Sequence, residues 1–318
     1  MDKKTHMILL CCLLLILIGN FIFPKWLTFL FNISLAKAFI VLGLVILMRV
    51  GLVSFGQGLY YCIGGYVAGI CQKFFGINDF FMILLIGIFI SLIVSFLLGL
   101  LLCNYRDIFF AMFTLAFSMI LYGIIVKTET LGSTDGFNVK LPTYFTISSS
   151  FATGKFLILL ITILIAYFVI IYIRKFFNSE LGYISLSTKE NEIRVEYLGI
   201  SPKIVIFINY SLAAILATVG GALTAFVSGH VDPDMAYWTT SGEFVFVALL
   251  GGTMHVIAPF IASILFEFIH MYAYDISPNT WQIILGSILL LIIIFLPRGL
   301  WSIGEIFRKK EVKDASNS

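Results

Sequence analysis

The sequence predicts an all-α membrane protein, a polytopic bundle of transmembrane helices. Hydrophobic residues make up 60% of the 318 residues and charged residues only 12%, about half of the charged share of a typical soluble domain. The mean hydropathy is +1.06. The apolar residues also recur in runs as long as a bilayer-crossing helix needs. So little polar surface excludes a water-soluble fold, and we expect one membrane-embedded domain over residues 1–318.

Ten apolar segments are expected to supply about eight to ten spans. They are residues 7–23, 33–49, 51–71, 80–102, 108–126, 156–173, 204–227, 242–252, 256–274 and 280–297. Segment 242–252 is too short to cross alone at 1.5 Å per residue, and segment 51–71 is rich in glycine, so one or two short or broken helices are expected. Residues 7–23 are expected to be a retained helix rather than a cleaved signal peptide, because no clear cleavage site follows.

The distribution of lysine and arginine predicts the orientation. With a cytoplasmic N-terminus and ten crossings, 14 of the 20 basic residues fall inside and six outside, as the positive-inside rule requires. The six outside residues are Lys25, Lys37, Lys73, Lys127, Lys140 and Lys155. Both termini are therefore expected to be cytoplasmic, together with a long inner loop at 174–203 and a tail at 298–318.

The inner loop contains the signals of a short helix outside the bilayer. Ser187 and Glu190 have the spacing of an N-terminal capping box. Gly199 suits a left-handed C-terminal cap, and Pro202 prevents the helix from continuing. The pattern predicts one helix over about 187–199. It fits either a solvated loop or a rigid element that docks into a cytoplasmic partner.

Polar side chains recur on helix faces within the predicted spans. Thr114, Ser118 and Tyr122 share one face, which is consistent with interhelical hydrogen bonds or with a lined pathway. Glu267 and His270 share another face, and an acid inside a membrane suggests either function or a pair that fixes helix orientation.

Two further patterns concern packing and helix starts. Small residues on one face of 204–227 predict close helix packing. Thr240 and Glu243 have capping-box spacing, which predicts a helix start at Thr240.

Several classes of site are not supported. The five cysteines form no CxxC pair and nearly all lie in apolar stretches, so no zinc site or disulfide framework is expected. The histidines show no metal-ligand spacing, and no catalytic set stands out. The sequence also lacks the G-x-x-x-x-G-K-[ST] phosphate loop, so this chain is not expected to bind ATP.

Six segments in order along the chain resemble the LivM-type permeases of ABC importers for branched-chain amino acids. They are the glycine-rich segment 51–66, the Gly-Ser-Thr-Asp-Gly loop 132–136, the charged segment 190–200, the small-residue segment 213–225, the late segment 232–253 and the Leu-Pro-Arg-Gly-Leu segment 296–300. Two positions depart from the pattern. Gln57 stands where many relatives have histidine, and Met254-His255-Val256 replaces a run of small residues.

The resemblance implies a transport subunit rather than an enzyme, located in the cytoplasmic membrane. It implies a homologous second permease subunit, two cytoplasmic ATPase subunits that use the ATP, and an extracytoplasmic substrate-binding protein. The lipid bilayer is the remaining expected partner. Neither nucleic acid nor a cofactor is expected to bind this chain. Urea or a short amide is the alternative substrate; a stand-alone secondary transporter or a membrane-embedded enzyme is the alternative class.

Two sets of candidate residues follow. The residues expected to couple to the ATPases, from the charged segment that carries the resemblance, are Glu190, Glu192, Arg194, Glu196 and Gly199. The candidates for lining the pathway, from their polar side chains within the predicted spans, are Gln57, Thr114, Ser118, Tyr122, Glu267 and His270.

Overall fold

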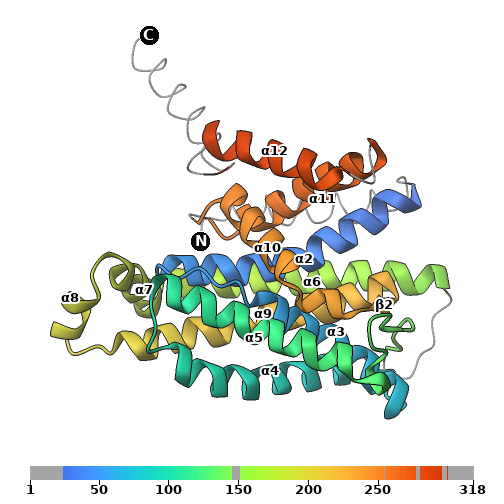
Figure 1. Ribbon diagram of the computed structural model, residues 1–318, viewed down its shortest axis with the longest axis horizontal. Coiled ribbons are helices and arrows are strands. Elements are labelled where there is room, and N and C mark those ends of the chain that lie inside the picture. Colours follow the sequence, from blue (N-terminus) through green and yellow to red (C-terminus); the bar gives the residue numbers. More distant parts are fainter. Residues whose placement is uncertain (1–23, 145–150, 254, 277–279, 296–298, 300–318) are drawn as a thin grey trace, which may run out of the picture.

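The computed structural model describes residues 24–144, 151–253, 255–276, 280–295 and 299 (Figure 1). In these residues nine helices correspond to predicted spans. They are α2 (Lys25–Arg49), α3 (Gln57–Phe74), α4 (Phe80–Leu102), α5 (Asp107–Lys127), α6 (Phe151–Phe177), α9 (Pro202–Ser228), α10 (Trp238–Gly251), α11 (Ala258–Ile276) and α12 (Trp281–Phe295). The predicted all-α bundle is therefore confirmed, whereas the predicted span 7–23 lies outside the described residues.

Five of these helices are long and apolar enough to cross a membrane: α2, α4, α5, α6 and α9. The segment 242–252, predicted to be too short to cross alone, lies in the short helix α10. Its 14 residues extend only about 21 Å, less than the roughly 30 Å thickness of a bilayer core.

The centre of the bundle is formed by α2 and α9, which are buried along most of their length. The small residues predicted to pack closely do so. A Cβ atom on Gly221 of α9 would lie 2.0 Å from the carbonyl oxygen of Tyr61, and one on Gly64 of α3 would lie 2.0 Å from that of Thr218. Glycine at both positions lets the backbones of α3 and α9 approach each other.

The predicted helix over 51–71 is interrupted at its start. Residues 51–56 are not helical, and α3 begins only at Gln57. Gly51 has a φ of +90°, which a helix cannot accommodate. Side chains replace the missing helical hydrogen bonds, since the amide of Phe55 donates to Thr114 and the amide of Gly56 donates to Ser54. Such irregular backbone is tolerated at membrane depth where protein surrounds it.

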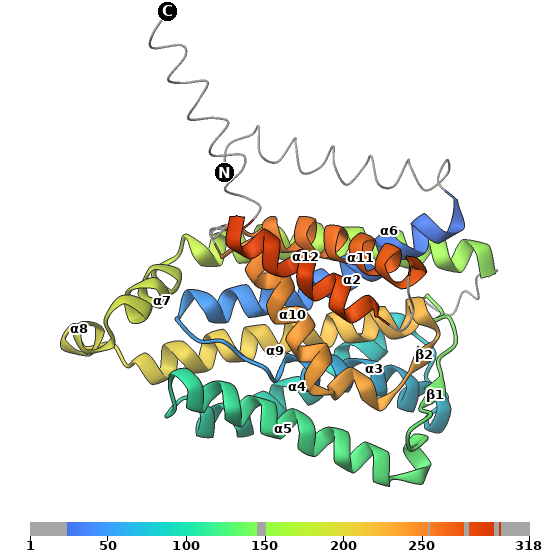
Figure 2. The same ribbon diagram turned by 45° about the horizontal axis from the view of Figure 1, so that its top comes forward.

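The two ends of the bundle differ in structure. At one end, α7 (Glu180–Glu190) and α8 (Glu192–Tyr197) project beyond the long helices (Figure 1). At the other end lies a small antiparallel ribbon of β1 (Phe137–Asn138) and β2 (His230–Val231) (Figure 2). Two 3-10 helices, η1 (Glu129–Leu131) and η2 (Pro233–Ala236), flank this ribbon in the sequence.

Candidate functional site

The residues predicted to line a pathway form two groups on different helices. Thr114, Ser118 and Tyr122 lie on α5 and contact the segments before α3 and α10, and Gln57 is the first residue of α3. Glu267 and His270 lie on α11, and Glu267 pairs with α2 instead. The first group is neutral and the second is charged.

The neutral group connects α5 to two irregular segments. The hydroxyl of Thr114 accepts from the amide of Phe55 at 3.2 Å, in the segment before α3. The hydroxyl of Ser118 donates to the carbonyl of Ala236 at 2.7 Å, in η2. The ring of Tyr122 packs on that of Tyr237, with centroids 5.0 Å apart. These side chains therefore hold α5 against the breaks that precede α3 and α10.

Gln57 is fully buried at the first position of α3. Neither atom of its side-chain amide has a hydrogen-bond partner within the described residues. Nearly all buried polar groups are paired, so an unpaired amide calls for a specific explanation. The neighbouring amide of Gly58 does have a partner, the hydroxyl of Ser241 at 3.0 Å. The side-chain amide of Gln57 therefore forms no hydrogen bond, within the described residues, that would give it a structural role.

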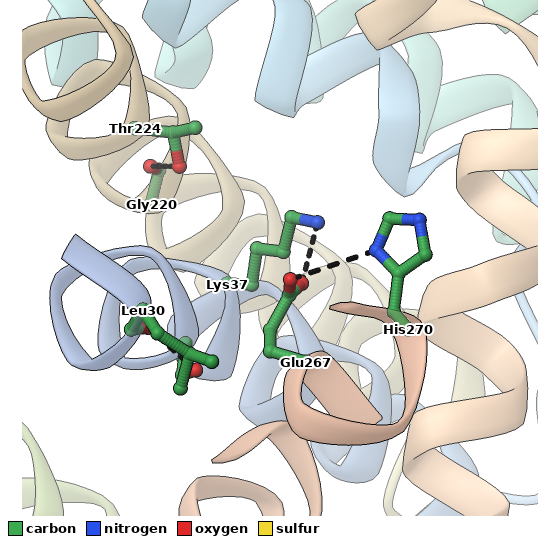
Figure 3. A network of polar contacts seen from close by, with 7 residues as sticks. Leu30, Lys37, Gly220, Thr224, Glu267 and His270 are labelled. Atoms are coloured by element: carbon green, nitrogen blue, oxygen red, sulfur yellow. Dashed lines mark hydrogen bonds and ion pairs between the residues drawn. The ribbon is translucent and has the colours of Figure 1, made fainter. Parts of the chain in front are cut away.

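The charged group centres on an ion pair inside the bundle. The ammonium of Lys37 lies 2.6 Å from a carboxylate oxygen of Glu267, and Nδ1 of His270 lies 3.7 Å from the other oxygen (Figure 3). Counting Lys37 among the outside residues was wrong, because this residue lies in the middle of α2. Apolar neighbours on both sides of Lys37 were the available signal, since an intramembrane charge usually has a partner.

Glu243 belongs to the same group. The helix start predicted at Thr240 is wrong, because α10 begins at Trp238 and the Thr240 hydroxyl donates to the carbonyl of Asp234. Glu243 therefore lies one turn inside α10 and does not cap it.

A small cavity of about 10 Å³ separates α2, α10 and α11. Its lining residues are Lys37, Val41, Glu243, Phe244, Val247, Ser263, Phe266 and Glu267. The hydroxyl of Ser263 is buried without a partner among the described residues. The volume is close to the minimum for one water molecule, and the polar lining suits one. The space is far too small for an amino acid.

The single helix predicted over 187–199 is wrong, because the chain forms two helices there. Ser187 lies within α7 and donates to the carbonyl of Tyr183 instead of capping a helix. The break falls at Asn191, which is extended with φ −162° and caps α8 by accepting from the amide of Arg194. Asparagine competes effectively with backbone groups in this way, which favours a new helix start.

The predicted end of this segment is confirmed. Gly199 is left-handed with φ +81°, and its amide donates to the carbonyl of Glu196 at 2.9 Å. The next helix, α9, begins at Pro202, whose missing N–H costs nothing at the first position.

The surface of α8 is apolar at its tip. Ile193, Tyr197 and Leu198 are 63%, 87% and 74% exposed, whereas Val195 packs inward and is 2% exposed. Among the predicted coupling residues, Glu192 pairs with Arg106 at 2.5 Å. The other four, Glu190, Arg194, Glu196 and Gly199, are exposed.

At the opposite end the loop 132–136 packs against the segment that follows α9. A Cβ atom on Gly136 would lie 1.9 Å from the carbonyl oxygen of Val231, so only glycine fits there. Burial, with the neighbouring charge of Asp234, raises the pKa of Asp232. The loop 132–136 and the segment 230–234 are thus in contact although they are far apart in the sequence.

Comparison with known proteins identifies the family. Residues 27–293 match the family model "Branched-chain amino acid transport system / permease component". The chain is 25% identical over 295 residues to the high-affinity branched-chain amino acid transport system permease protein LivM of Salmonella typhimurium, covering 84% of this chain and 68% of the relative. It is 25% identical over 292 residues to the LivM protein of Escherichia coli, with the same coverage. No solved structure matches this chain. The protein belongs to the family of permease components of branched-chain amino acid transport systems.

Proposed function

We propose that this chain is one membrane-spanning half of an ATP-driven importer for branched-chain or related amino acids. A permease component is a transport subunit without an enzymatic site or a cofactor of its own. The substrate class is supported by the names of both relatives. The observation that carries the mechanism is α8, a short capped helix that projects from one end of the bundle and exposes apolar side chains.

The end formed by α7 and α8, which we name the docking element (Glu180–Tyr197), is the cytoplasmic end in this proposal. Seven basic residues lie at that end of the described bundle and five at the other. Those at the docking end are Arg49, Arg106, Arg174, Lys175, Lys189, Arg194 and Lys203; those at the opposite end are Lys25, Lys73, Lys127, Lys140 and Lys155. This asymmetry agrees with the positive-inside rule even after Lys37 is removed from the outer set.

The docking element is the contact for a cytoplasmic ATPase subunit. Large apolar side chains grouped at a water-facing tip mark a site of protein interaction. Ile193, Tyr197 and Leu198 form such a group, and Glu196 and Arg194 surround it with charge. In this proposal one ATPase binds here, and a second ATPase binds a homologous permease subunit. A substrate-binding protein delivers the amino acid to the opposite end, near β1 and β2.

The charged group argues against a stand-alone secondary transporter. Such a transporter needs an intramembrane site for its coupling ion. Glu267 is the best placed acid, but its carboxylate already pairs with Lys37 at 2.6 Å. The negative charge of Glu267 is therefore balanced by Lys37, and the pair fixes α11 against α2.

The test of function is uptake by the assembled complex. We expect proteoliposomes containing this chain, its second permease, its ATPases and its binding protein to accumulate labelled leucine, isoleucine or valine only with internal ATP. Vesicles with an ATPase that binds but cannot hydrolyse ATP are the control. Uptake of urea in preference to all three amino acids would assign the alternative substrate, and ATP-independent uptake would contradict the importer.

The test of orientation uses single cysteines in a chain without other cysteines. Ser187→Cys in α7 is expected to resist an impermeant thiol reagent in intact cells, whereas Thr134→Cys in the opposite loop reacts. Both positions are exposed in this chain. Labelling of the Ser187→Cys variant in intact cells would reverse the orientation.

A further inference from the structure

An ion pair joins the docking element to the turn between α4 and α5. The Arg106 side chain lies 2.5 Å from Glu192, the first residue of α8. The same guanidinium donates to the carbonyl of Cys103 at 2.6 Å and to that of Tyr105 at 2.9 Å. It is therefore fixed to the turn while it holds α8. A guanidinium suits this position, because its several donors point in a fixed fork.

The helix that follows this turn contacts the rest of the protein through one narrow stripe. The buried residues of α5 are Phe110, Thr114, Ser118 and Ile125, and the others are partly or fully exposed. The central α9, by contrast, is buried along most of its length. A helix held along one stripe can shift along or about its axis at lower cost than one packed on all sides.

The stripe includes two hydrogen bonds to irregular backbone. Thr114 lies eight residues after Arg106, which is about 12 Å along a helix. Ser118 lies twelve residues after Arg106, which is about 18 Å along a helix. Thr114 holds the amide of Phe55 before α3, and Ser118 holds the carbonyl of Ala236 before α10. Transporters typically form their substrate sites at breaks in transmembrane helices.

We propose that Arg106 is a positioning residue that couples α8 to α5, so that movement of the docking element passes along α5 to Phe55 and Ala236. This inference rests on the proposed function of the docking element. Another contact of that element leads elsewhere: Asn209 of α9 donates to Ser185 of α7, which connects it to the central helix. Among the described residues, the Arg106–Glu192 pair is an ion pair that connects this element to the helix carrying predicted pathway residues.

The same pair is a weak contributor to folding. Its two side chains are 26% and 34% exposed, and partly exposed ion pairs contribute little to stability. Loss of the pair is therefore expected to change coupling while the complex still assembles.

The first test measures amino acid transported per ATP hydrolysed in the reconstituted complex. We expect Arg106→Gln and Glu192→Gln each to lower this ratio at least about fivefold, the lower range of a typical coupling between sites. The exchanged pair, Arg106→Glu with Glu192→Arg, restores the attraction but not the donation to the Cys103 and Tyr105 carbonyls, so it should recover only part of the ratio, to a value above that of either single variant. Lys127→Gln, at the far end of the same helix, is the matched control and should leave the ratio unchanged.

A second test needs no transport. Hydrogen–deuterium exchange of residues 51–56 in the complex is expected to be faster in both single variants than in the wild type or in Lys127→Gln, because the constraint on Thr114 is relaxed. Unchanged exchange there, an unchanged transport ratio in Arg106→Gln, or failure of the exchanged pair to recover would each overturn the inference. So would loss of assembly in both single variants. A wild-type complex without ATP-driven uptake would instead contradict the proposed function, and the exchange measurement would still decide the role of Arg106.

Discussion

Two groups of polar side chains lie inside the bundle, and they differ in charge. The group around Lys37 and Glu267 contains full charges that neutralise each other between α2 and α11. The group around Thr114 and Ser118 is neutral and bonds to backbone atoms of irregular segments. A charge inside a membrane is costly unless it is paired, whereas a neutral hydrogen bond there contributes little. The charged group therefore fixes α2 against α11, and our proposal places movement in the neutral group.

The largest expected effect tests the charged group. Lys37→Met leaves the carboxylate of Glu267 without its nearest partner, and breaking a buried pair from one side destabilises by about 3–5 kcal/mol. The double variant Lys37→Met with Glu267→Met removes both charges and is expected to be much closer to the wild type. The measurement is the unfolding midpoint of the purified complex in detergent. If the single variant were as stable as the double variant, the pair would not hold α2 and α11 together.

A smaller effect, of opposite sign, is expected at Gln57. Gln57→Leu replaces an unpaired buried amide by an apolar side chain of similar size, which should stabilise the protein by about 1 kcal/mol or more. If Gln57 lines the pathway, as the sequence predicts, transport falls in this variant. Gln57→Met is a second variant that removes the amide, and it should have the same two effects. Gln57→Glu is not used, because it would bury a charge. Lower stability with normal uptake would place Gln57 in the packing of the core.

The smallest effect on stability is expected in the neutral group. Ser118→Ala and Thr114→Val each remove one hydrogen bond between α5 and irregular backbone. A hydrogen bond between helices in a membrane is worth about 0.6 kcal/mol on average, which sets the scale of the effect. The unfolding midpoint should therefore change little, while the transport ratio falls in both. A loss of stability comparable to that of Lys37→Met would remove the distinction between the two groups.

A last prediction concerns Gly199, which lies just after the docking element. Gly199→Val is expected to reduce substrate-stimulated ATPase activity, since a left-handed φ costs a side chain with a branched Cβ at least about 1 kcal/mol. Open space surrounds the glycine, with no atom within 4 Å of an added Cβ, so strain and not collision is tested. Gly199→Asn, which tolerates this conformation better, is the matched control. Equal activity in both variants and the wild type would show that the cap is not needed.

Local patterns predicted most of the helices. The apolar run 80–102 coincides with α4, because a span is specified by its own hydropathy. Gly199 and Pro202 also behave as predicted, since each acts through its own backbone. Capping-box spacing misled twice, at Ser187 and at Thr240. Three residues is also the spacing of neighbours within a helix, so the pattern alone does not distinguish a start from an interior.

The sequence by itself therefore determined the membrane class, the spans, the family resemblance and the charge asymmetry, all of which depend on short stretches of chain. Only the tertiary structure decided which polar residues meet. Lys37 and Glu267 are 230 residues apart, and Arg106 and Glu192 are 86 apart. A partner at such a distance is selected by how the helices pack against one another. No local preference of either residue encodes that arrangement.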